Sequence, residues 1–435
     1  MAVASLFILL FILLIIGVPV GFAIGGATMF SMFMFSDMNM IINSQYCYSG
    51  IFSFTVMAIP FFMLAGTIMS TGGIAKRIVN FASALVSFVD GAIGCVSIIA
   101  CMFFGALSGS GMATASAIGS MMIPEMRKKG YDPSYAATII CFGGIVGPII
   151  PPSLSFVLYG AATNVSIPKL FLAGILPGVL IGLIFVISNI IMCKRAGVDL
   201  RKSNRDDEKV PMSQAMAYRF KEIIKAGVDG FWALLSPIII LGGIYSGIFT
   251  PTEAACVSVV YSIVISMFVY KEMKLKDLFN TFLDTSTLNG ITSFLLGYST
   301  VFSTFMTFEK VPQGITEFLT GVSDSPYVVL MVINVILLAI GCFLDTVPAI
   351  IVMAPMLLPT VQAMGIDPIH FGVIMAVNLA LGLCSPPYGC NLFVGAAVAK
   401  IKMESMFKYI IPYFIIGIIS LLIITFVPWL SLVFI

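Results

Sequence analysis

The sequence has few of the residues that soluble domains and metal or redox sites use. Charged residues make up 10% of the 435 positions, and His370 is the only histidine. The 9 cysteines lie mostly in apolar runs without C-x-x-C spacing, which is typical of small buried side chains and not of ligands or disulfides. A His-rich metal site is therefore excluded. The scattered basic residues, at a net charge of +2, predict no nucleic-acid surface.

Apolar residues dominate instead. The chain is 60% hydrophobic with a mean hydropathy of +1.10, which predicts a polytopic membrane protein. No basic residue precedes the apolar run at residues 2–17 and no small-residue cleavage site follows it, so we expect a retained span and not a signal peptide. At about 20 residues per span, we expect helices at 2–17, 20–35, 53–70, 170–192, 231–249, 251–270, 288–308 and 410–428.

Residues 105–160 are apolar but interrupted twice, at Ser108–Gly111 and between Gly143 and Ser153. Glycine and proline leave backbone groups unpaired. At membrane depth such groups are tolerated only where they are buried in protein or line a polar cavity. Broken helices near the bilayer midplane therefore predict a solute or ion site.

The same pattern occurs a second time. Gly147, Pro151 and Pro152 recur as Gly382, Pro386 and Pro387, and Asp132 recurs as Asp367; 386 − 151 and 367 − 132 both equal 235. This register places Ser110-Gly111 on Asp345-Thr346. An internal duplication of this kind is typical of a repeat-built transporter.

The duplication predicts two re-entrant helical hairpins, at 91–126 and 326–362, and two broken helices, at 132–163 and 367–398. Arg127, Lys128 and Lys129 follow the first hairpin, whereas residues 360–367 contain no Lys or Arg. Because basic residues favour the cytoplasmic side, we predict an all-α membrane protein with two inverted-topology repeats. We expect surface arms at residues 73–85, at 310–321 and in the second half of 194–225. The segment around Arg201 and Lys202 is expected to be a solvated loop.

For four acidic residues, a structural role as a helix cap has to be weighed against a functional role. Glu253 completes a capping box with Thr250. Asp132 and Asp367, each before a proline, are expected to be helix caps. Asp345 is the one acid at a hairpin tip, where it either binds an ion or solute or caps the next helix. No chain of buried acids or histidines points to proton coupling.

Sodium is a hard cation, so we expect uncharged oxygens and at most one carboxylate around it. Tip 108–110 would face the unwound segment 144–151, and tip 345–346 would face 382–386. The candidate sodium ligands are Ser108, Gly109, Ser110, Gly144, Gly147, Pro151, Gly341, Asp345, Thr346, Gly382, Ser385 and Pro386. The candidate substrate contacts are Ser110, Ser153, Ser155, Asp345, Thr346, Tyr388 and Asn391. Tips and breaks contain no Lys or Arg, so amide groups, hydroxyls and bound cations would hold a carboxylate.

The motifs ALSGSGMATASAIGSMMIPEM, GGIVGPIIPPS, GIFTPTEAA and LGLCSPP together resemble the large membrane (M) subunit of the tripartite ATP-independent periplasmic (TRAP) transporters. The resemblance implies sodium-driven uptake of a carboxylate across the bacterial inner membrane by an elevator mechanism. The carboxylate would be sialic acid or a C4-dicarboxylate, with a slight preference for sialic acid. It also implies a small membrane subunit, a periplasmic binding protein, no catalysis and no cofactor besides Na⁺. The family's sites fall on the two tips and on the segments after Gly144 and Gly382. Gly111 departs from the serine-like residue of many members, which puts a hydroxyl ligand there in doubt.

An elevator mechanism needs a static scaffold and a moving transport domain, and we expect the chain to be divided between them. The expected parts are scaffold helices at 1–70, an arm at 71–90, a first transport repeat at 91–163, scaffold with a cytoplasmic arm (194–230) at 164–325, a second transport repeat at 326–399 and a terminal scaffold helix at 400–435.

Three alternative functions stay open. One is an autonomous sodium-dicarboxylate carrier. A second is an intramembrane enzyme using Ser110 and Asp345, for which no nearby base is found. The third is a channel, which two inverted hairpins disfavour.

Overall fold

The computed structural model describes residues 1–86, 92–195, 212–323, 325–386 and 388–435. These residues form helices and their connections, and none of them forms a β-strand. The predicted all-α fold is therefore confirmed for the described part of the chain. Three expectations lie outside the described residues: the start of the first transport repeat at residue 91, the loop around Arg201 and Lys202, and the repeated Pro387.

The described helices run from one end of the sequence to the other. The first half holds α1 (Ala2–Ile15), α2 (Val20–Phe35), α3 (Ile41–Ile51), α4 (Ala58–Thr71), α5 (Ile74–Val86), α6 (Ala92–Ser108), α7 (Gly111–Lys128), α8 (Pro133–Gly144), α9 (Leu154–Thr163) and α10 (Ile167–Arg195). The second half holds α11 (Met212–Asp229), α12 (Phe231–Tyr245), α13 (Pro251–Val264) with a π-helical turn (Ile265–Val269), α14 (Leu275–Phe308), α15 (Val311–Val322), α16 (Pro326–Phe343), α17 (Thr346–Ala363), α18 (Pro368–Gly382), α19 (Cys390–Ala399), a 3-10 turn (Met403–Met406), α20 (Phe407–Phe426) and α21 (Trp429–Leu432).

The duplication is visible in the helix boundaries. Helices α7 and α17 begin at residues 111 and 346, and α8 and α18 begin at 133 and 368; 346 − 111 and 368 − 133 both equal 235. The pairs α6–α7 and α16–α17 lie in the ranges expected for the hairpins, and α8–α9 and α18–α19 in those expected for the broken helices. Both α16 and α17 are long and apolar enough to cross a membrane, so the re-entrant path stays a prediction. The repeats also contact each other reciprocally, since α9 packs on α17 and α19 packs on α7. Their opposite orientation in a membrane stays a prediction.

Helix caps form where the sequence predicts them. Asp132 Oδ1 accepts from Ser134 N at 2.7 Å, and Asp367 Oδ1 accepts from Ile369 N at 2.7 Å. Each aspartate thereby satisfies an amide that the first helical turn leaves unpaired. Glu253 accepts from the backbone N of Thr250 at 2.8 Å, and Thr250 accepts in return, which completes the capping box. All three acids are explained by these bonds.

The expected spans need correction at three places. Among the described residues, six helices are long and apolar enough to cross a membrane, or up to eight if each bent pair counts as one span. Helices α1 and α2 have only 14 and 16 residues. The span expected at 288–308 is the second part of the 34-residue helix α14, because Asp277 and Asp284 lower hydropathy without interrupting a helix. The span expected at 53–70 begins at Ala58, and α3, which was not expected, precedes it.

The single histidine and the cysteines are packed inside the protein. His370 is 2% exposed in α18, with Nε2 3.3 Å from the carbonyl oxygen of Thr425. All nine cysteines are free, and only Cys47, Cys256 and Cys390 are even partly exposed. The expectation of small buried cysteine side chains is confirmed for six of the nine, and the imidazole of His370 is packed between helices.

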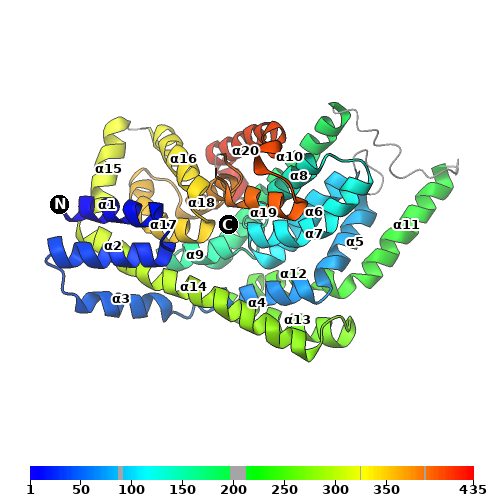
Figure 1. Cartoon of the computed structure of the whole chain (residues 1–435), viewed down its shortest axis with the longest axis horizontal. Helices are drawn as coiled ribbons and strands as arrows, with labels where there is room; N and C mark the ends of the chain where they lie inside the picture. Colours follow the sequence, from blue (N-terminus) through cyan, green and yellow to red (C-terminus); the bar gives the residue numbers. More distant parts are fainter. Residues whose placement is uncertain (87–91, 196–211, 324, 387) are drawn as a thin grey trace.

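The largest hydrophobic core joins both repeats with α10 and α20. Phe142 of α8 lies 5.6 Å from Phe185 of α10 and 5.4 Å from Tyr413 of α20, measured between ring centroids. Helices α10 and α20, which the expected division assigns to the scaffold, pack on α6, α8 and α18. The division itself stays a prediction. Two smaller cores lie between α1, α2 and α14, and around α4 and α13. Figure 1 shows α1, α2 and α3 (blue) at one end of the molecule and α11 at the other.

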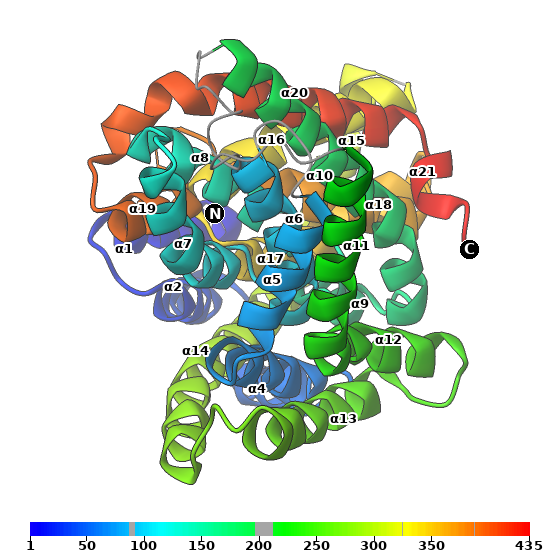
Figure 2. The same cartoon turned by 90° about the vertical axis from the view of Figure 1, so that its right-hand side faces the viewer.

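The expected arms are helices that leave their neighbours at sharp angles. Helix α5 bends by 68° from α4, and α11 bends by 64° from α12. Figure 2 shows α5 and α11 running side by side, in agreement with their direct contact. The third arm, α15, contacts α14, α16 and α17. The position of these arms on a membrane surface stays a prediction.

Candidate functional site

The first tip is a two-residue turn between α6 and α7. Gly109 takes a φ of +63°, a left-handed conformation that favours glycine and lets the chain reverse. Ser110 then caps α7, its Oγ accepting from Ala113 N at 3.4 Å. Thr114 Oγ1 donates to Ser110 O at 2.7 Å, and Ser108 Oγ lies 3.0 Å from Thr114 Oγ1. The tip therefore gathers three hydroxyl groups within two turns, and Ser108 and Ser110 are only half-buried.

This tip lies directly against the first break. A Cβ on Gly105 would stand 2.3 Å from the Cα of Gly147, so the two backbones touch where only glycine fits. A Cβ on Gly109 would stand 2.9 Å from Leu154 N and 3.6 Å from Pro152 O. Gly109 of the tip thus lies against residues 152 and 154, just beyond the segment 144–151 that was expected to face it. Gly105 was missed, because a lone glycine in an apolar helix carries no sequence signal of close approach.

The second tip is built differently. Asp345 caps α17 and accepts at Oδ1 from Thr346 N at 2.7 Å and from Thr346 Oγ1 at 3.3 Å. The carboxylate is half-buried and Thr346 is 6% exposed. Of the two roles expected for Asp345, the helix cap is therefore present in the structure. It occupies one carboxylate oxygen and leaves a role in binding open.

A glycine pair and two hydrogen bonds hold the second tip to its break. A Cβ on Gly382 would stand 2.5 Å from the carbonyl carbon of Gly341. Beyond this contact, Gly389 N donates to Cys342 O at 3.2 Å, and Cys342 Sγ donates to Ser385 O at 3.3 Å. The pair Gly341–Gly382 plays the part that Gly105–Gly147 plays in the first repeat.

The residues expected to contact a solute are mostly enclosed. Ser153 is 1% exposed and caps α9, with its Oγ donating to Pro148 O and accepting from Phe156 N at 3.4 Å. Ser155 is 2% exposed and Asn391 is 0% exposed. Only Tyr388, at 48% exposed, is open in this conformation, and its ring lies 5.1 Å from that of Phe393.

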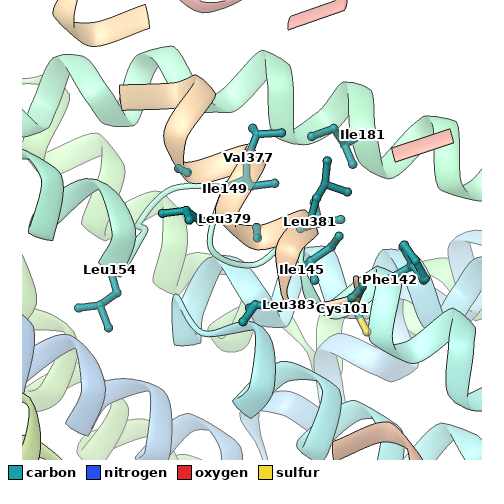
Figure 3. Packing of buried hydrophobic residues seen from close by; sticks show 14 of the residues in the cluster. Cys101, Phe142, Ile145, Ile149, Leu154, Ile181, Val377, Leu379, Leu381 and Leu383 are labelled. Atoms are coloured by element: carbon teal, nitrogen blue, oxygen red, sulfur yellow. The ribbon is translucent and has the colours of Figure 1, made fainter. Parts of the chain in front are cut away.

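The two breaks meet in the centre of the molecule. Asn391 Nδ2 donates to Cys141 O at 2.7 Å, which joins the second broken helix to the first. A Cβ on Gly111 would stand 3.5 Å from Gly144 O and 3.5 Å from Leu383 Cδ1. Figure 3 shows the apolar side chains around this junction, with Ile145 of the first repeat beside Leu381 of the second. Cys141 was not predicted to take part, since nothing in the local sequence indicates its partner.

The chemistry available at the two tips is that of neutral oxygen. Among the residues that the structure describes, no group of three or more His, Cys, Asp or Glu could hold a metal ion. Hydroxyls, carbonyls and one carboxylate are instead available, and these are hard ligands. The arrangement suits an alkali cation as cargo better than a resident transition metal.

Comparison with known proteins bears on the whole chain. Residues 7–430 match the family described as "Tripartite ATP-independent periplasmic transporter, DctM component". The C4-dicarboxylate TRAP transporter large permease protein DctM of Vibrio cholerae is 39% identical over 99% of this chain and 97% of its own length. The sialic acid TRAP transporter permease protein SiaT of Haemophilus influenzae is 38% identical over 86% of this chain and 59% of its own length.

One solved structure shows the same fold at low identity. The YdaH transporter of Alcanivorax borkumensis has a TM-score of 0.56 at 11% identity, with 90% of each chain covered. The family match and the relatives extend over the tips, the breaks and the helices around them. The chain belongs to the DctM-component family of the tripartite ATP-independent periplasmic transporters and is a multi-pass protein of the inner membrane.

Proposed function

We propose that this transporter subunit, which is not an enzyme, imports a small carboxylate in symport with sodium. The observation that carries the proposal is the pair of tips, each packed on a break of its own repeat and both in one core. Hydroxyls and carbonyls at 108–110 and 345–346 would bind sodium. Because no Lys or Arg lies in either tip or break, bound sodium ions would supply the positive charge that a carboxylate needs, beside amide groups and hydroxyls.

The transport step in this proposal is an elevator movement. The moving unit is proposed to comprise both repeats together with α10 and α20, because α10 packs on α6, α8, α9 and α18, and α20 packs on α8, α10 and α18. Helices α1–α4 and α12–α14 form the static scaffold, and α5 and α15 link it to the two hairpins. The basic residues near Arg127 and near Lys400 place the first hairpin toward the cytoplasm and the second toward the outside.

The proposed partners are a small membrane subunit and a periplasmic binding protein, which the tripartite family implies. The substrate is proposed as a class only. Relatives named for C4-dicarboxylate and for sialic acid are 39% and 38% identical, so likeness does not choose between them. Because Ser153, Ser155, Asn391 and Thr346 are enclosed, the proposed first contacts of a solute are Tyr388, Ser110 and Asp345.

Uptake into proteoliposomes tests the proposal. The chain is reconstituted with and without its small subunit, binding protein and a sodium gradient, and supplied with labelled sialic acid or a labelled C4-dicarboxylate. We expect uptake of one of them only when all three are present. Uptake by the chain alone would establish an autonomous carrier instead. Uptake that ignores the sodium gradient would contradict sodium coupling.

A further inference from the structure

Asn391 ties the two broken helices together at their breaks. It is the second residue of α19, and its Nδ2 donates to Cys141 O at 2.7 Å, three residues before the first break begins after Gly144. Cys141 returns a bond from its Sγ to Asn391 O at 3.2 Å. The backbone N of Asn391 donates to Leu383 O at 3.0 Å, in the first turn after α18. One residue therefore holds the second break and the end of α8 at the same time.

Helices α8 and α19 are closely packed around Asn391. A Cβ on Gly144 would stand 3.2 Å from Asn391 Nδ2 and 2.9 Å from Gly111 O, at the end of the first tip. A Cβ on Gly395, one turn along α19, would stand 2.2 Å from Cys141 Sγ. Close-packed interiors of this kind transmit a displacement instead of absorbing it.

We propose that Asn391 is a positioning residue that couples the two repeats, so that sodium binding at one tip favours sodium binding at the other. The inference rests on the proposed sodium symport and specifies how its two sites act together. An ion that orders Gly144 and the first tip also fixes Cys141 O, and through Asn391 it fixes Leu383 and the second break. Couplings between sites typically change affinity roughly 5- to 150-fold.

The chain offers a matched control. Asn378 of α18 is also 0% exposed, but its Nδ2 donates to Asn334 O at 2.9 Å and to Asn334 Oδ1 at 2.8 Å, both in α16 of the same repeat. Asn378→Ala and Asn391→Ala therefore remove the same buried amide. Only the second substitution cuts a bond between the repeats.

Sodium titrations of uptake by the reconstituted complex, and of the melting temperature of the purified chain, test the coupling. We expect a Hill coefficient above 1 for the unaltered protein and for Asn378→Ala. For Asn391→Ala we expect a value of about 1 and sodium affinity reduced roughly 5- to 150-fold. Asn391→Leu, which keeps about the size of the side chain and loses the donor, should behave like Asn391→Ala.

Each other outcome has a defined meaning. An unchanged Hill coefficient in the Asn391 variants overturns the coupling, as does an equal fall in Asn378→Ala. If both Asn391 variants fail to fold while Asn378→Ala folds, Asn391 is a structural residue and the inference is overturned. A sodium-dependent but non-cooperative unaltered protein also overturns it and leaves the symport intact. Uptake without sodium dependence removes the symport itself.

Discussion

The two repeats enter their hairpins through helices of different shape. An offset of 235 places α14, residues 275–308, on residues 40–73 (275 − 235 and 308 − 235), where α3 and α4 are separate helices. Pro60 of α4 has Leu295 as its counterpart, since 295 − 60 equals 235. A proline ring clashes with the carbonyl four residues earlier, which disfavours an extension of α4 back through Val56, although α10 does continue through Pro177. Leu295 makes no such clash, and α14 continues.

The tips differ in chemistry while their backbones agree. In both repeats a glycine pair brings the hairpin onto the break, at Gly105–Gly147 and at Gly341–Gly382. The first tip carries the neutral Ser108 and Ser110, whereas the second carries Asp345. The glycine contacts therefore give the two hairpins a shared shape, and the polar side chains at the tips are where the repeats differ.

The largest expected effect comes from altering the tips. Ser110→Ala and Asp345→Ala should each abolish sodium-driven uptake, because each removes an oxygen ligand. Membrane insertion should be retained, and stability should fall only by the roughly 0.5–2 kcal/mol that loss of a helix cap costs. Uptake in proteoliposomes and thermal melting check both. Full activity in both variants would contradict the tip sites.

Asp345→Asn sharpens the comparison between the tips. Asparagine keeps an oxygen to accept from Thr346 N and caps helices as well as aspartate does, but it carries no charge. We expect loss of uptake with normal stability if the charge binds the ion. Normal uptake would assign Asp345 to capping alone.

Smaller effects are expected from single substitutions at Pro60 and at its counterpart, Leu295. Leu295→Pro should destabilise the protein by about 3 kcal/mol or more, because it removes a helical hydrogen bond and adds a clash inside α14. Pro60 lies in the first turn of α4, where its missing N–H is not needed, so Pro60→Ala should cost only about 0.4–1 kcal/mol through the entropy of the unfolded chain. Thermal melting of both variants in detergent measures the difference, and equal losses would contradict this explanation of the straight and broken helices.

The two arms that lead to the hairpins, α5 and α15, are also held to their neighbours by different side-chain contacts. Arg77 of α5 is 15% exposed and donates from Nη1 to Glu272 Oε1 at 2.8 Å, and its guanidinium lies 3.6 Å from the ring centroid of Tyr270. At the second arm, Ser36 Oγ donates to Glu309 Oε1 at 2.9 Å, just before α15. The first arm is therefore held by an ion pair and an aromatic ring, and the second at this point by one hydrogen bond.

The smallest expected effects come from removing these contacts of Arg77 and Ser36. Arg77→Met should lower stability by about 1–2 kcal/mol through loss of the ion pair and the cation–π contact. Ser36→Ala should cost no more than about 0.5–1.5 kcal/mol for its single hydrogen bond. Thermal melting at low and high salt compares them, and the deficit of Arg77→Met should shrink as salt screens the pair. A larger loss for Ser36→Ala would reverse the ranking of the two arms.

Much of the backbone could be predicted because its signals are local. Asp132-Pro133 and Asp367-Pro368 predict helix starts, and the caps form within three residues of each aspartate. The partners of Gly105 and Cys141 could not be predicted, because Gly147 and Asn391 come together only when the helices pack. The extent of α14 was underestimated because its acidic residues resemble the end of a span, although they do not stop a helix.

The sequence by itself determined the membrane class, the duplication by 235 residues and the places where helices break, because composition and the conformational limits of glycine and proline act on neighbouring residues. Only the tertiary structure decided that α10 and α20 pack on the repeats, that Ser153, Ser155 and Asn391 are enclosed, and that the two breaks touch through Asn391 and Cys141. Those features depend on which apolar faces meet, and hydrophobic packing has no direction that a single helix could encode.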